Sequence, residues 1–110
     1  MSMVEEAARE LERGGTRYVV ITLGEAGLLA VAGSDSWLAR PGERVTGNAT
    51  GAGDAVLAGL ADGLLRGLEW PDLLRRAVAL GAATVAAPVA GEFAVEEYQR
   101  HIRIAEVGAR

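Results

Sequence analysis

Cysteine and lysine are both absent from these 110 residues. Without cysteine the chain can form neither a disulfide framework nor a thiolate metal site. All eleven cationic residues are arginine. This excludes a Walker P-loop, because that motif uses a lysine to reach the nucleotide phosphates.

Long apolar runs and excess positive charge are also missing. No apolar run reaches the length of a membrane span. The formal charge of -4 gives no electrostatic reason to expect nucleic acid or an anionic membrane as a partner. Residues 1–6 are acidic and helical in pattern, unlike a signal peptide. We therefore expect a soluble cytoplasmic protein, with its single histidine, His101, at the surface.

The first quarter of the chain predicts a helix followed by a strand. Half of all residues are apolar, enough to bury a core, and the length predicts one small domain. A helix is expected over 3–13, because four apolar residues recur at helical spacing opposite most of the charges: Val4, Ala7, Ala8 and Leu11. Residues 18–23 form a continuous, largely β-branched run, typical of a strand buried on both faces of a parallel sheet.

Two more strands are expected at one edge of that sheet, over 28–32 and 37–40. Turn residues at 24–27 and 33–36 separate the three runs. These spacings indicate a hairpin or a meander.

Helices are expected over most of the second half. A central helix is predicted over 51–66, with a broad apolar face made of Val56, Leu57, Leu60, Ala61, Leu64 and Leu65. Gly59 and Gly63 inside it each cost roughly 1 kcal/mol relative to alanine. Close packing against a neighbouring helix or strand would explain that cost, and Gly67 is the expected C-cap.

A third helix is predicted to start at Trp70-Pro71, where proline suits the first helical position. It continues into an alanine-rich end that Pro88 stops. A short helix over 95–101 and a terminal strand over 102–107 complete the chain.

The stretch from Asn48 to Gly59 organises the rest, because a glycine-containing turn runs directly into a helix. Gly51 and Gly53 let a ligand approach the backbone closely. The unpaired N–H groups of the first turn and the positive end of the helix dipole make a site suited to phosphate. Asp54 in that turn is either a group that complements the dipole or a base that takes a proton from a hydroxyl.

Asn48-Ala-Thr-Gly-Ala-Gly-Asp54, followed by Ala-Val-Leu-Ala-Gly59, resembles the C-terminal signature of the PfkB (ribokinase-like) carbohydrate kinases. The resemblance implies that Gly51, Ala52, Gly53 and Asp54 form the anion hole over the transferring phosphoryl group. It also implies that Asp54 is the general base, and that ATP and Mg²⁺ are used.

Thr22-Leu-Gly-Glu-Ala-Gly27 resembles the second nucleotide segment of this family, although without the family it is more simply a hairpin turn. The alanine-rich end of the third helix is either a closely packed helix or a wall of the adenine pocket, and these are compatible. The nucleotide-binding residues implied by the resemblance are Thr22, Leu23, Gly24, Glu25, Gly27, Asn48, Thr50, Gly51, Gly53, Ala82 and Ala83.

The implied fold is α/β: the C-terminal portion of a ribokinase-like three-layer sandwich, with a mostly parallel sheet, a β-meander edge and packed helices. The resemblance covers nearly the whole chain, but the family's N-terminal sugar-binding section and lid are not in it. The family's magnesium-binding Asn-x-x-Glu motif is missing too, so we expect no metal ligand in this chain. Residues 39–48 and 87–92 look most like the 1-phosphofructokinase and tagatose-6-phosphate kinase branch.

The expected reaction is transfer of the ATP γ-phosphoryl group to a hydroxyl of a sugar or sugar phosphate. We do not expect the 110 residues alone to catalyse it. Two alternatives remain open. The chain is a non-catalytic nucleotide-binding module, or it is a truncated remnant that folds by self-association. A homo-oligomer is expected, because the open edge of a sheet invites pairing with another chain.

Overall fold

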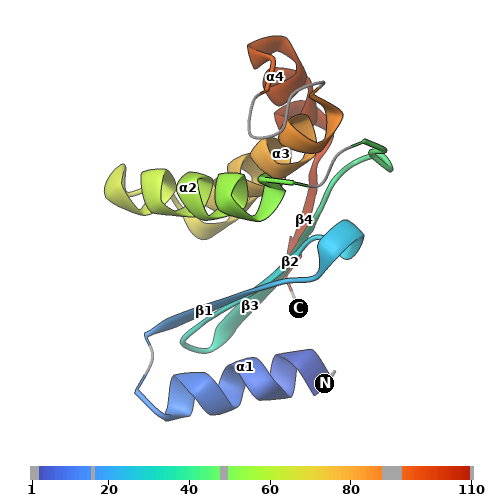
Figure 1. The fold of residues 1–110 in the computed structure, drawn as a ribbon. Helices are drawn as coiled ribbons and strands as arrows, with labels where there is room; N and C mark the ends of the chain where they lie inside the picture. The colour runs from blue at the N-terminus through green and yellow to red at the C-terminus, as the bar shows by residue number, and fades with distance from the viewer. Residues whose placement is uncertain (1–2, 16, 48–49, 88–92, 110) are drawn as a thin grey trace.

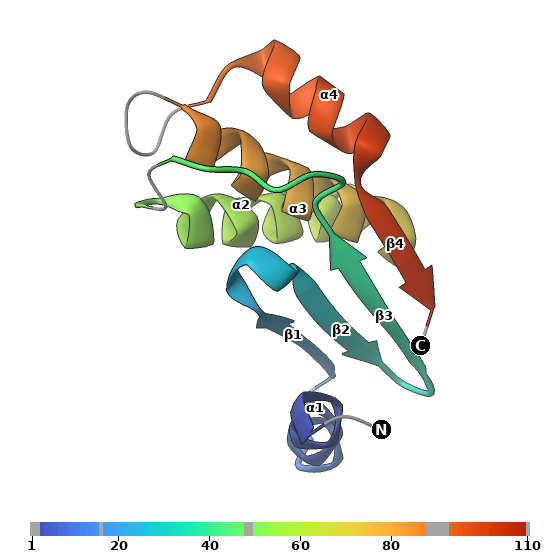
Figure 2. The ribbon, with the colours of Figure 1, turned by 90° about the vertical axis from the view of Figure 1, so that its right-hand side faces the viewer.

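The computed structural model describes residues 3–15, 17–47, 50–87 and 93–109. A β-sheet forms the middle of three layers, with α1 on one face and the other α-helices on the opposite face (Figures 1 and 2). In chain order the elements are α1 (Met3–Arg13), β1 (Tyr18–Thr22), the 3₁₀ turn η1 (Gly24–Ala26), β2 (Leu28–Ala32), β3 (Asp35–Arg40), α2 (Ala52–Leu65), α3 (Trp70–Ala86), α4 (Val95–Ile104) and β4 (Glu106–Ala109). None of the helices in the described ranges has the length and apolar character needed to cross a membrane.

The four described strands form one antiparallel sheet in the order β1-β2-β3-β4, not the mostly parallel sheet that the sequence predicted. Its connections explain the difference. A parallel pair needs a crossover of about a dozen residues or more, whereas β2 and β3 are joined by Gly33 and Ser34 alone. The predicted meander is confirmed, with β3 beginning at Asp35.

Strand β1 was predicted to be buried on both faces, and it is not. It pairs only with β2 among the described residues, so it lies at an edge of the sheet. Val19 is buried, but Tyr18 is 43 % exposed. An apolar, β-branched run predicts a strand without saying how many neighbours that strand has.

The main core lies between the sheet and α3. Leu28, Ala30 and Ala39 from the strands pack with buried side chains of α2 and α3 and with Ala105, which lies between α4 and β4. Two tryptophans close one end of this layer, because the Trp37 and Trp70 rings stack with their centroids 6.0 Å apart.

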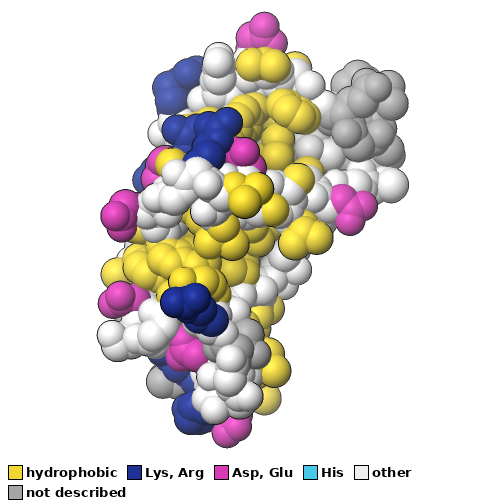
Figure 3. All heavy atoms as spheres, turned by 90° about the vertical axis from the view of Figure 1, so that its left-hand side faces the viewer, with side chains coloured by type: hydrophobic (Ala, Val, Ile, Leu, Met, Phe, Trp, Pro, Cys, Tyr) yellow, Lys and Arg dark blue, Asp and Glu magenta, His cyan; other side chains and the backbone are white. Residues whose placement is uncertain are grey.

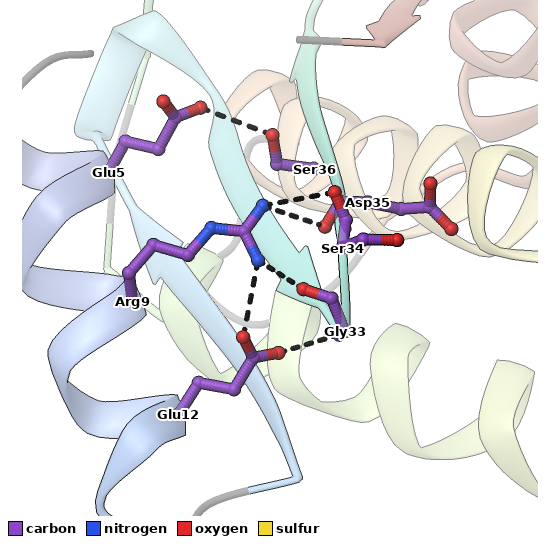
Figure 4. A network of polar contacts seen from close by, with 7 residues as sticks. All are labelled: Glu5, Arg9, Glu12, Gly33, Ser34, Asp35 and Ser36. Carbon is purple, nitrogen blue, oxygen red and sulfur yellow. Dashed lines mark hydrogen bonds and ion pairs between the residues drawn. The ribbon is translucent and has the colours of Figure 1, made fainter.

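Helix α1 covers the other face of the sheet with its polar side, contrary to the predicted apolar face. Ala8 alone of the four predicted residues is buried, whereas Leu11 is 56 % exposed. Charged side chains of α1 instead form hydrogen bonds with backbone groups of the β2–β3 hairpin (Figure 4). Arg9 donates to the Gly33 carbonyl, and the Gly33 N–H donates to Glu12 Oε2 at 2.6 Å. Turn backbone groups need hydrogen-bond partners, and the charged side of α1 supplies them.

The close packing predicted for the glycines of α2 is confirmed against α3. A Cβ at Gly59 would lie 3.1 Å from Ala77 Cα, and one at Gly63 would lie 2.7 Å from Leu73 Cγ. Gly67, with φ of 70°, follows the last turn of the helix as expected. The predicted broad apolar face of α2 is only partly covered, because Leu57, Leu64 and Leu65 are 66 %, 49 % and 89 % exposed.

The C-terminal elements differ from the prediction in their boundaries. Helix α4 runs on to Ile104, so the terminal strand begins at Glu106. His101 is not at the surface: it is 1 % exposed, and its Nε2 lies 3.5 Å from Glu97 Oε2. It is buried because α4 packs on α3, which a polar stretch of sequence does not reveal. Pro88, predicted to stop the third helix, lies outside the described residues.

Candidate nucleotide site

The start of α2 has the geometry of an anion site. Gly51 precedes the helix with φ of 85° and ψ of -7°, a left-handed conformation that favours glycine. The first helical bond joins the Ala55 N–H to the Gly51 carbonyl at 3.0 Å. The N–H groups of Ala52, Gly53 and Asp54 therefore have no partner within the helix.

Gly53 leaves open space above this turn. A Cβ built there meets no described atom within 4 Å, so nothing in the fold itself requires glycine at this position. Asp54 is exposed in the same turn. The first turn thus presents backbone donors and one solvent-accessible carboxylate together.

A cavity of about 920 Å³ extends from the start of α2 to the turn after β1. Seven of the residues singled out in the sequence line it: Thr22, Gly24, Glu25, Gly27, Ala52, Gly53 and Ala82. These residues come from the β1–η1 turn, the start of α2 and the middle of α3. The fold therefore brings together three segments that are separated by up to about 60 residues in the sequence.

Other expected site residues do not line this cavity. Leu23, Gly51 and Asp54 lie next to lining residues in the chain, and Thr50 lies two residues before Ala52. Ala83 is 1 % exposed inside α3. Asn48 lies outside the described residues.

The Thr22–Gly27 turn is shaped by its own hydrogen bonds. The Leu23 N–H donates to the Gly27 carbonyl at 2.8 Å, and the Gly27 N–H donates to the Gly24 carbonyl at 3.1 Å. A Cβ at Gly27 would lie 1.9 Å from the Ala39 carbonyl oxygen, so packing against β3 requires glycine there. At Gly24 a Cβ would meet nothing, although its φ of 60° also favours glycine.

Sequence reasoning missed the connection between β3 and α2. All residues from Arg40 to Gly47 line the cavity, although the sequence analysis used residues 39–48 only for the branch of the family and assigned none of them to the site. Two positions in it are glycines pressed against other backbone segments, Gly42 and Gly47. The two glycines of this loop and the family resemblance over 39–48 were the available signals.

The cavity wall carries charges of both signs. Arg44 Nε lies 4.0 Å from Glu25 Oε2, with both side chains mostly exposed. Glu43 accepts a hydrogen bond from Arg100 of α4, and this bond holds the pKa of the Glu43 carboxyl below its usual value. No group of three or more His, Cys, Asp or Glu side chains that could hold a metal occurs in the described ranges.

Comparison with known proteins gives the family. The sequence profile of the pfkB family carbohydrate kinases matches residues 1–97. This chain belongs to the pfkB family. The pfkB-family chain is 40 % identical over 85 residues to the 1-phosphofructokinase of Escherichia coli K12. The aligned part covers 77 % of this chain and 27 % of that relative. It is 37 % identical over 84 residues to the 1-phosphofructokinase of Rhodobacter capsulatus, covering 74 % of the chain and 27 % of the relative.

Solved structures place the pfkB-family chain in the ribokinase-like fold. The chain superposes on phosphofructokinase-2 of Escherichia coli with a TM-score of 0.85 and 24 % identity, over 91 % of this chain and 33 % of that one. Ribokinase of Thermotoga maritima gives a TM-score of 0.80 and 24 % identity, over 93 % and 35 %. The chain thus spans about a quarter of the length of its curated relatives.

Proposed function

We propose that this chain supplies the anion hole, the catalytic base and part of the ATP site of a kinase that phosphorylates a sugar or sugar phosphate. One observation carries the proposal. The backbone donors at the start of α2 and the glycine turn after β1 border the same cavity, which is large enough for a nucleotide. Relatives that are 1-phosphofructokinases favour a hexose phosphate as the acceptor.

In the proposed reaction the acceptor hydroxyl oxygen bonds to the γ-phosphorus of ATP. The bond from that phosphorus to the bridging oxygen breaks, and ADP leaves with the electron pair. Asp54 takes the hydroxyl proton. The N–H groups of the first turn of α2 stabilise the negative charge on the equatorial oxygens, where one well-placed donor is typically worth about 3 kcal/mol.

Magnesium is expected with ATP in this family, but the described residues do not form a site for it. Asp54 and the backbone donors are therefore assigned no part in holding the ion. We propose that the ion is held by residues outside the described ranges together with the nucleotide phosphates.

The sugar-binding residues are also expected outside these 110 residues. The chain spans only 27 % of the 1-phosphofructokinases that it resembles. We therefore propose that residues 1–110 act as one nucleotide-side unit and need a sugar-side unit for turnover. A homo-oligomer is part of the proposal, in line with the tetrameric form of the E. coli phosphofructokinase-2 neighbour.

Calorimetric titration with ADP tests the nucleotide site in the chain as it stands. Gly53→Val places a branched side chain over the phosphate donors, in space that no described atom occupies, so the variant should fold. Loss of charge-assisted hydrogen bonds should weaken ADP binding about tenfold or more. Ala58→Val, at an exposed position of the same helix, should bind ADP as the wild type does. Equal affinity in all three proteins would contradict the proposal.

The alternative is a nucleotide-binding module without catalysis. It is favoured by the same cavity and by the 27 % of its 1-phosphofructokinase relative that the chain spans. Adding the N-terminal part of a 1-phosphofructokinase in trans distinguishes the two, because only the kinase proposal expects phosphoryl transfer to appear.

A further inference from the structure

The loop that forms one wall of the cavity has little to hold it in its own backbone. We call residues 41–47 the cavity loop, and all seven line the cavity. Within the described part of the chain, none of them makes a backbone hydrogen bond outside helices and strands, and none belongs to either. The shape of this wall therefore depends on what the loop touches.

Two glycines fix the ends of the cavity loop against helix ends. A Cβ at Gly42 would lie 2.0 Å from the carbonyl oxygen of Ile104, the last residue of α4. A Cβ at Gly47 would lie 2.2 Å from the Val85 carbonyl oxygen near the end of α3. Both contacts are backbone against backbone, so they leave no room for any other residue.

Between these two glycines, one side-chain link ties the loop to α4. Arg100 Nη2 donates to Glu43 Oε1 at 2.5 Å and to Glu97 Oε2, one turn earlier on α4, at 3.1 Å. The other ion pair of the loop, between Arg44 and Glu25, spans 4.0 Å and is mostly exposed. Arg100 is thus the principal polar attachment of the loop.

Helix α4, which carries Arg100, is held in place by contacts with α3. Arg75 of α3 donates to the Ala105 carbonyl and, at 3.4 Å, to the Ile102 carbonyl. β4 continues from there as the last strand of the sheet, where Glu106 pairs with Arg40. The link from Arg100 to Glu43 therefore joins the cavity loop to a fixed platform.

We propose that Arg100 is a positioning residue for the nucleotide site, with α4 and β4 acting as a strap that holds the cavity loop in place. Arg100 also neutralises Glu43, a carboxylate in the cavity wall that would otherwise repel nucleotide phosphates. The effect on nucleotide binding rests on the proposed function, whereas the effect on loop order does not.

Backbone ¹⁵N relaxation of the cavity loop in the 110-residue chain tests the strap. In the wild type we expect the order parameters of the loop amides to be near those of rigid backbone, about 0.8, and in Arg100→Gln below about 0.6. Glu43→Gln should give a similar fall, and the double variant should be no worse than either single one. Arg100→Lys, which keeps the charge, should restore most of the order.

Glu97→Gln is the matched control. It removes the other partner of Arg100 on the same helix and leaves the link to the loop intact. Loop order should therefore stay at the wild-type value. If Glu97→Gln loosens the loop as much as Arg100→Gln does, the effect is a general loss of α4 and the strap is refuted.

Titration of the same proteins with ADP tests the consequence for the nucleotide. Since exposed ion pairs are weak, Arg100→Gln should lower ADP affinity only about two- to fivefold. Glu43→Gln should lower it less, because no unpaired carboxylate remains. If the variants change loop order but no protein, the wild type included, binds ADP, the strap is upheld and the proposed function is refuted. Unchanged loop order in Arg100→Gln would overturn the strap.

Discussion

Gly51 and Asp54 have different physical reasons to stand at the start of α2. Gly51 adopts a left-handed backbone that costs other residues roughly 1 kcal/mol or more. Asp54 has no such backbone constraint: it is exposed in the first turn of the helix. Two explanations of its carboxylate stay open, complementing the helix dipole and acting as the proposed base.

Replacing this carboxylate separates the two explanations. In a kinase made of the N-terminal part of a 1-phosphofructokinase and residues 1–110, Asp54→Asn should lower kcat by about 10²- to 10⁴-fold, because the amide cannot accept the proton. ADP affinity should change little, since the anion hole uses backbone donors. Asp62→Asn, an exposed acid paired with Arg66 on the same helix, is the control and should keep full turnover. Wild-type turnover in Asp54→Asn would remove the base assignment.

At this scale the sequence predicted the turn glycines well and the cavity wall poorly. Gly51, Gly24 and Gly27 lie in the turns that were predicted there, and all three have positive φ values. The surroundings of Glu43 and His101 were missed. Glu43 is bound by Arg100, which lies 57 residues later in the chain. His101 is buried because α4 packs on α3. Contacts between distant segments leave no local pattern.

The α2–α3 packing shows what a small-residue stripe does for an element. Gly63 is buried directly against Leu73, which is itself 0 % exposed. A methyl group at position 63 would therefore clash with the Leu73 side chain. The helix gives up intrinsic stability at this position so that α3 can approach closely.

Gly63→Ala measures that trade. Better helix propensity contributes about 1 kcal/mol in favour of alanine, whereas overpacking a tight core costs about 1–3 kcal/mol. We expect a net loss of about 1 kcal/mol in the free energy of unfolding, measured by urea denaturation. The exposed position Ala58 gives the reference, because Ala58→Gly should lose about 1 kcal/mol through propensity alone. A stabilised Gly63→Ala would mean that the close approach of α2 and α3 is not required.

Element types were easier to predict than element neighbours. The helix over 3–13 and the strand over 28–32 were predicted with their observed bounds. The burial of β1 on both faces was predicted wrongly, because the strand lies at an edge of the sheet. The buried side of α1 was also predicted wrongly, because the hairpin turn needs the charged side chains of α1 and apolar spacing says nothing about that need.

For the whole molecule, the most telling feature is how much apolar surface stays uncovered. β1 leaves one edge of the sheet without a partner strand among the described residues. Leu57, Leu64 and Leu65 of α2 are largely exposed. Figure 3 shows a broad hydrophobic area in the middle of one face, between polar groups above and below. Small domains bury a limited fraction of their surface, so such an area is costly to leave in water.

We therefore expect the 110-residue chain to associate with a second copy. Sedimentation at low micromolar concentration should give a dimer or a larger assembly. Leu57→Arg combined with Leu65→Arg places charges on this surface and should shift the chain towards monomer, while Glu96→Arg, exposed on α4, should not. A stable, well-folded wild-type monomer would refute this expectation.

The central claim is that backbone N–H groups at the start of α2 bind the phosphates of a nucleotide, and amide spectra of the ¹⁵N-labelled chain test it most directly. ADP should shift the amides of Ala52, Gly53 and Asp54 together with those of Gly24 and Gly27, since these segments border one cavity. Adenosine, which lacks phosphate, should leave the three α2 amides nearly unchanged. Shifts of those three amides that are equal with ADP and adenosine, or absent with both, would contradict the account.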